Sequence, residues 1–326
     1  MATPRRDLVT VCLRGAGQVF FMENAVTGAF FLAAIAYASH ATGTWAILAG
    51  ALLGLVVSTL TARLLDYDRK TIDAGLFGFN GILVGVAVPS FLAITPQLWV
   101  CVVVGAAAST VFASAFSATL TRQWGIPAST GPFVLTGWLI VAAAYSFGGL
   151  KVAAGAPEFA TDYLRGVSAM PAPMEFGRIL LRNIGQVFLL GSEVSGALVL
   201  AGILVASVPA GIAALTGSGV ATLVAVGMGA DPVLVSQGLY GFSAVLTAIA
   251  VGVVFFPPSV KGALYASLAT VVTVFVEGAL NVMVAPDGIP SFTAPYVLTM
   301  YLFVAAASGS GGDGNRGAVD TDASAV

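Results

Sequence analysis

The sequence predicts an all-α integral membrane protein in which ten transmembrane helices form two inverted five-helix repeats with paired re-entrant half-helices. Of its 326 residues, 58% are hydrophobic and only 9% are charged, whereas soluble domains carry about 25% charged residues. Most of the surface therefore has to face lipid. In addition, a segment with a threonine between two prolines, residues 126–133, recurs as residues 289–296. Paired interruptions of this kind point to a binding site in transport folds.

The first repeat is predicted to cover residues 1–150. It opens with residues 7–21, where Arg14 and Gln18 are mixed with apolar residues, and this segment is expected to lie at the interface or partly buried. Several of the apolar stretches that follow are shorter than the ~20 residues that an upright helix needs to cross a bilayer. They are predicted to be spans that are tilted, broken or half-spanning. These stretches are residues 26–41, 45–62, 75–93, 98–120 and 132–147.

The second repeat is predicted to cover residues 183–307, after a polar extracytoplasmic connector over residues 151–182. The tail, residues 308–326, is rich in Gly, Ser and Asp and is expected to be disordered. Five further apolar stretches are predicted to span the membrane within the second repeat. These stretches are residues 195–209, 211–229, 238–256, 262–284 and 295–307.

The two halves match at more than one place. Residues 14–21 resemble residues 182–189 at an offset of 168, and residues 75–80 resemble residues 238–243 at an offset of 163. An odd number of spans in each repeat makes the second copy enter the membrane from the opposite side. The sequence therefore predicts an inverted repeat about an axis in the membrane plane.

Charge supports the inversion. With both termini in the cytoplasm, nine Lys and Arg residues fall inside and four, all in the connector, fall outside, as the positive-inside rule requires. The loops around Asp231 and Asp287 contain no Lys or Arg, whereas their first-half counterparts are basic. The prediction is a multi-pass protein of the plasma (inner) membrane with cytoplasmic N- and C-termini.

Composition excludes several functions. His40 is the single histidine, no phosphate-binding loop surrounds Lys70, Lys151 or Lys261, and no metal ligands cluster in the sequence. We therefore expect no enzyme activity, no cofactor and no metal. The net charge of −2 without a basic patch excludes nucleic acid as a partner. The two cysteines lie far apart in apolar surroundings and indicate no disulfide framework.

Two carboxylates lie within apolar segments, Glu193 and Glu277. An intramembrane carboxylate is a functional candidate by default, but Glu277 can equally be a buried partner for a helix N-terminus. The scarcity of such groups argues against coupling to protons or sodium.

Gln18 and Gln186 occupy equivalent positions beside phenylalanines. Each can be an interhelical hydrogen-bonding residue that contributes about 1 kcal/mol, or an acceptor that faces a pore. Their duplication at equivalent positions favours the interpretation that both glutamines face a pore.

Phe79 and Phe242 lie in glycine-rich turns, and Leu83 and Leu246 follow four residues later on the same helical face. A single aromatic residue in such a place belongs most often to the core or to an interfacial belt. The repetition favours a constriction of stacked rings.

Thr130 and Thr293 each follow a proline by three residues. Threonine is a good N-cap, so each can open a half-helix. A cap placed where two half-helices meet in mid-membrane can also face a pore, because irregular backbone at that depth has to be buried in protein or line a water-filled cavity.

Together these segments resemble the urea transporter family. The resemblance rests on two Gln-Val-Phe segments, two Leu-[Phe/Tyr]-Gly-Phe turns and the doubled Pro-x-x-Thr-x-Pro motif, in order from about Arg14 to Leu302. It implies a homotrimer with one channel in each protomer, ten spans, two half-helical elements and passive conduction of urea and close analogues.

The resemblance also implies roles for particular residues. Gln18 and Gln186 would contact urea, Thr130 and Thr293 would face the central constriction, and Phe79, Phe242, Leu83, Leu246 and Val187 would line flat slots. The family has a further aromatic three residues after each glutamine. Phe21 matches it in the first repeat, but Leu189 stands in the second, so one slot wall is aliphatic unless Phe188 substitutes.

Three rivals stay open. The first is a channel for another small neutral solute such as water, ammonia or a short amide, although the aquaporin Asn-Pro-Ala pair is absent and His40 alone cannot build a paired-histidine ammonia pore. The second is an ion-coupled transporter that uses Glu193 or Glu277. The third is a structural or sensory membrane protein that conducts nothing, against which the duplicated polar positions argue.

Overall fold

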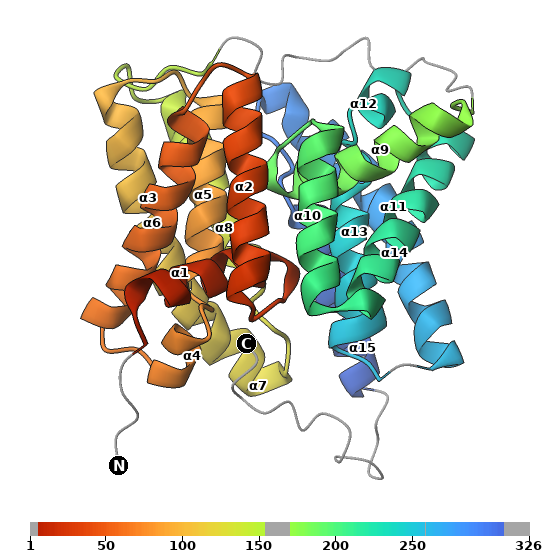
Figure 1. Ribbon diagram of the computed structural model, residues 1–326, viewed down its shortest axis with the longest axis horizontal. Helices are drawn as coiled ribbons and strands as arrows, with labels where there is room; N and C mark the ends of the chain where they lie inside the picture. The colour runs from red at the N-terminus through yellow and green to blue at the C-terminus, as the bar shows by residue number, and fades with distance from the viewer. Residues whose placement is uncertain (1–5, 154–169, 258, 310–326) are drawn as a thin grey trace.

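The computed structural model describes residues 6–153, 170–257 and 259–309, and this part of the chain is helical (Figure 1). Part of the predicted connector, residues 154–169, and the predicted tail from residue 310 onward lie outside the described residues. The first half contains α1 (Leu8–Gly17), α2 (Ala25–Ala41), α3 (Ala46–Leu64), α4 (Arg69–Asp73), α5 (Gly78–Phe91), α6 (Pro96–Phe116), α7 (Arg122–Trp124) and α8 (Gly131–Ala144).

The second half follows the same order of elements. Its helices are α9 (Pro173–Gly185), α10 (Glu193–Ala206), α11 (Val208–Gly227), α12 (Pro232–Ser236), α13 (Phe242–Ile249), α14 (Val260–Val284) and α15 (Ala294–Gly309). Two boundaries differ from the sequence prediction. The helix α9 begins at Pro173, inside the predicted connector, and α15 continues through Ser308 and Gly309, which were expected in the tail.

The lengths of the helices define a multi-pass membrane protein. Within the described residues, four helical segments are long and apolar enough to cross a membrane, and six spans result if each of two bent helix pairs counts as one. The shorter apolar helices α5, α8, α13 and α15 do not meet that criterion by themselves. The all-helical membrane class is confirmed, and the number of ten spans stays a prediction.

Each half begins with a bent helix pair. The axes of α1 and α2 meet at 77°, and those of α9 and α10 at 76°. A short 3-10 turn precedes each bend, Gln18–Phe20 in the first half and Gln186–Phe188 in the second. Each turn ends on a residue in the left-handed region, Phe21 at φ 64° and Leu189 at φ 59°. Each glutamine is the first residue of the 3-10 turn that follows its helix.

Glycines allow α3 and α5 to cross with their backbones in contact. A Cβ atom added to Gly54 would fall on the carbonyl oxygen of Gly81, and one added to Gly85 would fall on that of Gly50. Small residues at helix interfaces permit such close approach in membranes. The crossing fixes α5, whose first turn carries Phe79, against the outer helix α3.

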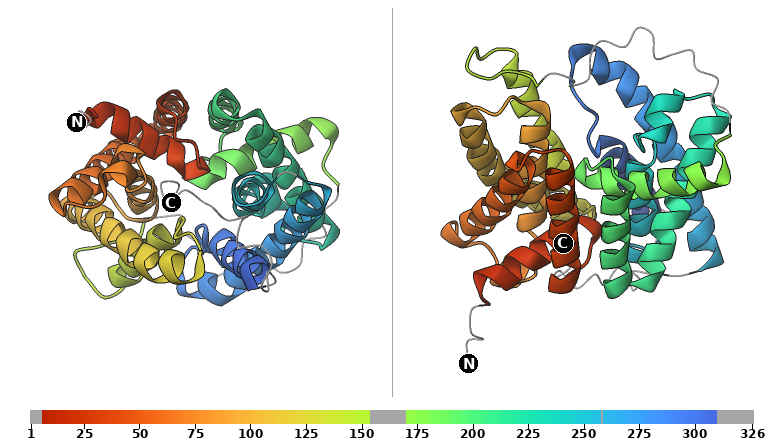
Figure 2. Two further views of the ribbon diagram at one scale, coloured as in Figure 1. Left: turned by 90° about the horizontal axis from the view of Figure 1, so that it is seen from below. Right: turned by 45° about the horizontal axis from the view of Figure 1, so that its top comes forward.

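The two halves meet through reciprocal hydrogen bonds between α2 and α10. The Thr27 hydroxyl donates to the Gly202 carbonyl at 2.8 Å, and the Ser195 hydroxyl donates to the Ala34 carbonyl at 3.2 Å. Each of these contacts is the counterpart of the other at the offset of 168, so the two helices run antiparallel. Reciprocal contacts are those of a two-fold-related interface. Figure 2 shows the first half, red to yellow, beside the second half, green to blue.

We expect Gly54→Ala to lower the free energy of unfolding in detergent by about 1–3 kcal/mol, the usual cost of overpacking, because its methyl group meets the backbone of α5. The matched control is Gly278→Ala in α14, where an added Cβ has nothing within 4 Å. Thermal unfolding of both variants measures the difference. Equal melting temperatures would contradict the close crossing.

Candidate functional site

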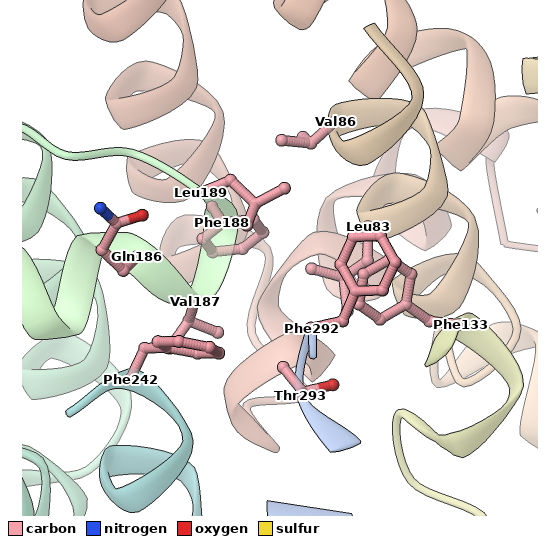
Figure 3. A pocket seen from close by; sticks show the side chains of 10 residues that line it. All are labelled: Leu83, Val86, Phe133, Gln186, Val187, Phe188, Leu189, Phe242, Phe292 and Thr293. Atoms are coloured by element: carbon pink, nitrogen blue, oxygen red, sulfur yellow. The ribbon is translucent and has the colours of Figure 1, made fainter. Parts of the chain in front are cut away.

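Two pockets lie between the halves. The larger, which we call the Gln18 pocket, has a volume of about 250 Å³ and is bordered by Gln18, Phe21, Phe79 and Thr130, among others. The second, the Gln186 pocket, is a narrower slot, and Gln186, Leu189 and Phe242 are among its walls (Figure 3).

The predicted site residues divide between these pockets. Gln18, Phe21, Phe79 and Thr130 line the Gln18 pocket. Leu83, Gln186, Val187, Leu189, Phe242 and Thr293 line the Gln186 pocket. Leu83 follows Phe79 by one turn of α5 and so reaches the other pocket.

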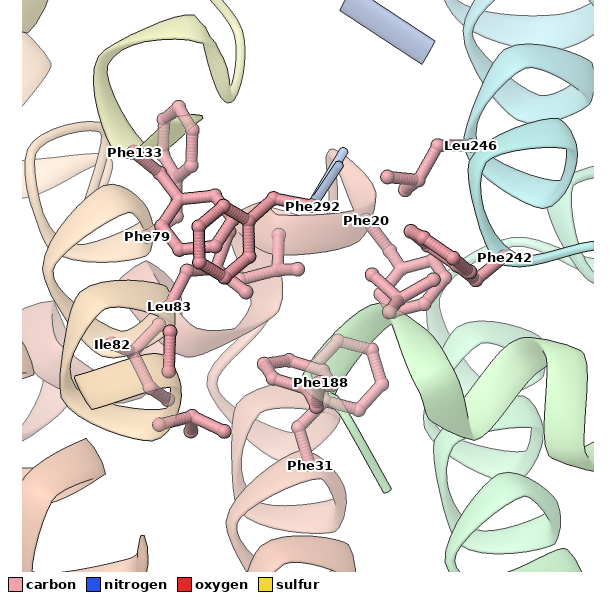
Figure 4. Packing of buried hydrophobic residues seen from close by; sticks show 14 of the residues in the cluster. Phe20, Phe31, Phe79, Ile82, Leu83, Phe133, Phe188, Phe242, Leu246 and Phe292 are labelled. Carbon is pink, nitrogen blue, oxygen red and sulfur yellow. The ribbon is translucent and has the colours of Figure 1, made fainter. Parts of the chain in front are cut away.

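Leu246 is the predicted site residue that the structure places elsewhere. Its side chain is fully buried and lines neither pocket. Figure 4 shows it on the same helix as Phe242, within the apolar core. Leu83 and Leu246 are equivalent in sequence, but only Leu83 lines a pocket.

The threonine pair lies between the two pockets. The Thr130 and Thr293 hydroxyl oxygens are 2.8 Å apart, and both residues are buried. Thr130 borders the Gln18 pocket and Thr293 the Gln186 pocket. Thr130 does occupy the N-cap position of α8, but its side chain makes no capping hydrogen bond. The hydroxyl instead faces its counterpart in the other half.

Side chains from the opposite half hold each interrupted segment. The Trp138 indole donates to the Pro290 carbonyl at 2.9 Å, and the Tyr301 hydroxyl donates to the Ala128 carbonyl at 2.8 Å. Trp138 and Tyr301 are themselves equivalent at the offset of 163. Backbone groups buried at membrane depth need such partners, so each half completes the other.

Asn80 adds a second support within the first half. Its amide nitrogen donates to the Ser129 carbonyl at 3.3 Å, and its amide oxygen accepts from the Phe133 backbone N–H at 3.0 Å. One buried side chain thereby joins the interrupted segment to the first turn of α8. This contact positions the Thr130 hydroxyl between the two pockets.

The two glutamines are oriented in the same way. The Gln18 amide nitrogen donates to the Ala74 carbonyl at 3.0 Å, and the Gln186 amide nitrogen donates to the Gln237 carbonyl at 2.8 Å. A carbonyl oxygen can only accept, so each amide presents its nitrogen to the backbone. The amide oxygen is left on the other side, where Figure 3 shows that of Gln186 directed to the pocket. Both glutamines are thus set as acceptors.

Two arginines reinforce this arrangement. The Arg14 guanidinium donates to the Asp73 carbonyl at 3.2 Å, and that of Arg182 donates to the Ser236 carbonyl at 2.9 Å. These carbonyls immediately precede the ones that the glutamines bind. Arg14 also pairs with Glu23 at 2.5 Å. The turns that orient the glutamine amides are therefore fixed at two successive carbonyls in each half.

The aromatic walls of the pockets differ. The Phe21 ring packs edge-on against Phe255, with centroids 5.7 Å apart. In the second half Leu189 takes the equivalent place. Phe188 also borders the Gln186 pocket, but its ring is fully buried against Phe20 at 6.0 Å and Phe31 at 5.5 Å (Figure 4). Phe188 therefore belongs to the core between the halves, and the wall at Leu189 is aliphatic.

The two candidate carboxylates line neither pocket. Glu193 pairs with Arg182 at 3.3 Å and is partly exposed. Glu277 is buried in α14 and accepts a hydrogen bond from the Ser291 hydroxyl at 2.8 Å. It supports the second interrupted segment through that side chain. Among the described residues, no three His, Cys, Asp or Glu side chains gather to hold a metal ion.

Site residues were predicted from their repetition at equivalent positions in the two halves. This criterion missed residues that differ between the copies. Ser129 and Phe292 are equivalent, lie beside the threonines and line opposite pockets. Each residue immediately precedes the threonine of a Pro-x-x-Thr-x-Pro motif. The difference between serine in one copy and phenylalanine in the other was the signal that could have identified them. Asn80 stands in the repeated turn but is replaced by Ser243 in the second copy. Phe255 carried no sequence signal.

The chain resembles known proteins over most of its length. The urea transporter family profile matches residues 9–308. The chain is 28% identical over 302 residues to urea transporter 1 of Ovis aries, covering 90% of this chain and 75% of that protein. It is 29% identical to urea transporter 1 of Rattus norvegicus, with the same coverage. The chain therefore belongs to the urea transporter family of non-enzymatic membrane transport proteins.

Proposed function

We propose that the protein is a passive channel-type transporter that conducts urea through a narrow pore within each protomer. The pore would run from the Gln18 pocket, past Thr130 and Thr293, to the Gln186 pocket. The observation that carries the proposal is the hydroxyl pair at 2.8 Å between two pockets, each of which contains an oriented glutamine. Family membership supplies urea as the substrate class.

The chemistry of urea suits these groups. Urea is planar, neutral and rich in N–H donors, and it loses water when it enters a narrow slot. A polar group without a partner in a dry environment costs about 4–8 kcal/mol on a scale without hydrogen bonding. The amide oxygens of Gln18 and Gln186 and the two threonine hydroxyls would replace that water. Several weak sites let a solute leave as readily as it enters.

The same pore gives ions no compensation for their lost hydration. The four polar groups proposed to meet urea, two amides and two hydroxyls, carry no net charge. Glu23 borders the Gln18 pocket but is paired with Arg14. Glu193 and Glu277 line neither pocket, which favours passive conduction over ion coupling.

We further infer ten spans in two inverted repeats, residues 1–150 and 183–307, joined by the connector. The antiparallel contact of the equivalent helices α2 and α10 supports this arrangement, because inverted repeats require their equivalent helices to run in opposite directions across the membrane. The short helices α8 and α15, which follow the interruptions, would be the re-entrant half-helices. Cytoplasmic termini, the plasma membrane and a homotrimer complete the proposal.

Purified protein in liposomes should take up urea in the absence of any ion gradient, with saturation at high concentration and competition by dimethylurea or thiourea. Passive binding at weak sites predicts this behaviour. Stopped-flow light scattering measures the flux against empty liposomes. Urea flux that appears only when a proton or sodium gradient is imposed would exclude a passive channel.

Thr130→Val and Thr293→Val should each slow urea flux about tenfold, which corresponds to about 1.4 kcal/mol in the barrier. Valine removes one hydroxyl that would replace the water urea loses at the constriction, and one such hydrogen bond contributes about 0.5–1.5 kcal/mol. The same stopped-flow assay measures the effect.

The chain offers a matched control for this experiment. The hydroxyls of Thr247 and Thr273 are also 2.8 Å apart and buried, but they join α13 to α14 and line neither pocket. Thr273→Val should therefore keep full flux. Full flux in Thr130→Val, or an equal loss in Thr273→Val, would remove the threonine pair from the pore.

A further inference from the structure

The two interrupted segments share a backbone but differ in one side chain beside the threonines. Ser129 and Phe292 are equivalent at the offset of 163, and both have φ 48°, in the left-handed region. Ser129 lines the Gln18 pocket and Phe292 lines the Gln186 pocket. A small polar group on one side therefore corresponds to an aromatic ring on the other.

The contacts of these two residues also differ between the two sides, polar for Ser129 and apolar for Phe292. The Ser129 hydroxyl is hydrogen-bonded to the Tyr296 hydroxyl at 2.5 Å. The Phe292 ring packs against the Phe133 ring, with centroids 5.0 Å apart and planes at 62°. Phe133 is the equivalent of Tyr296. A hydrogen-bonded pair on the Gln18 side is thus replaced by a ring pair on the Gln186 side.

A missing side chain makes room for the Phe292 ring. A Cβ atom added to Gly137 of α8 would lie 2.7 Å from Cε2 of Phe292. The equivalent position in α15 holds Met300, which is fully buried. Phe91 contacts the ring from another side, with centroids 5.5 Å apart. The ring is therefore held on several sides, and Figure 3 shows it beside Phe133 and Leu83 at the wall of the pocket.

The volumes of the pockets follow this exchange. The Gln18 pocket, with Ser129 in its wall, has a volume of about 250 Å³, whereas the Gln186 pocket, with Phe292 in its wall, is narrower. We propose that Phe292 makes the Gln186 slot the discriminating step of the pore and sets the largest substituent that a urea can carry through it. This inference rests on the proposed urea conduction.

The test reproduces the Ser129–Tyr296 pair on the Gln186 side with the double variant Phe292→Ser/Phe133→Tyr. Stopped-flow light scattering of proteoliposomes measures the flux of N-methylurea and 1,3-dimethylurea relative to that of urea. We expect each ratio to rise about tenfold, at the low end of the discrimination that a pocket achieves for one methylene. Phe292→Leu, which keeps an apolar side chain, provides a second variant with the same direction of change if the double variant does not fold.

Phe303→Leu is the control, because Phe303 is a partly buried phenylalanine that packs against Tyr265, with ring centroids 4.9 Å apart, and lines neither pocket. Its flux ratios should equal those of the unmodified protein. Unchanged ratios in folded Phe292 variants would overturn the inference, and so would an equal rise in Phe303→Leu. Failure of the unmodified protein to conduct urea is a separate result, and it would overturn the proposed function.

Discussion

The two interrupted segments meet at the hydrogen bond between Thr130 and Thr293, and the arrangement of the two pockets depends on this meeting. A residue and its own counterpart in the other repeat touch there, at 2.8 Å, so the two interrupted segments meet end against end. Interrupted backbone is costly at membrane depth unless protein satisfies it. Trp138 and Tyr301 reach across from the opposite half to supply those hydrogen bonds, and neither half can complete its interrupted segment alone.

Outside this contact, the halves keep equivalent geometry with different chemistry. Both glutamines donate to a backbone carbonyl at the same place in the repeat, and both bends end in the left-handed region. The pocket walls have diverged: Phe21 corresponds to Leu189, and Ser129 to Phe292. The backbone that creates the two pockets is therefore shared, while side-chain size gives each pocket its own width.

Much of the candidate site could be predicted from the sequence, because repetition marks positions that both halves need. Gln18, Gln186 and the two threonines were found by this criterion, and each borders a pocket. The same criterion predicted Leu246 as a site residue, but Leu246 is buried in the apolar core. Equivalent positions in the two repeats need not have the same surroundings. It also passed over Ser129 and Phe292, because their importance lies in their difference.

The fold could be predicted less completely. Composition indicates lipid-facing helices, and the structure confirms the all-helical membrane class. Bends and helix ends depend on left-handed residues such as Phe21 and on contacts between the halves, which hydropathy does not reveal. The expected disorder from residue 308 onward was wrong for Ser308 and Gly309, because α15 continues through them. The Gly- and Ser-rich composition of the tail did not locate the C-terminal end of α15.

The most direct test of the central claim is an experimental structure of the purified protein with urea, or with an analogue that carries a heavier atom, such as selenourea. The account predicts solute density on both sides of the Thr130–Thr293 pair, within hydrogen-bonding distance of the Gln18 amide oxygen on one side and of the Gln186 amide oxygen on the other. Density confined to a site away from both glutamines, or none between the halves at saturating solute, would contradict it.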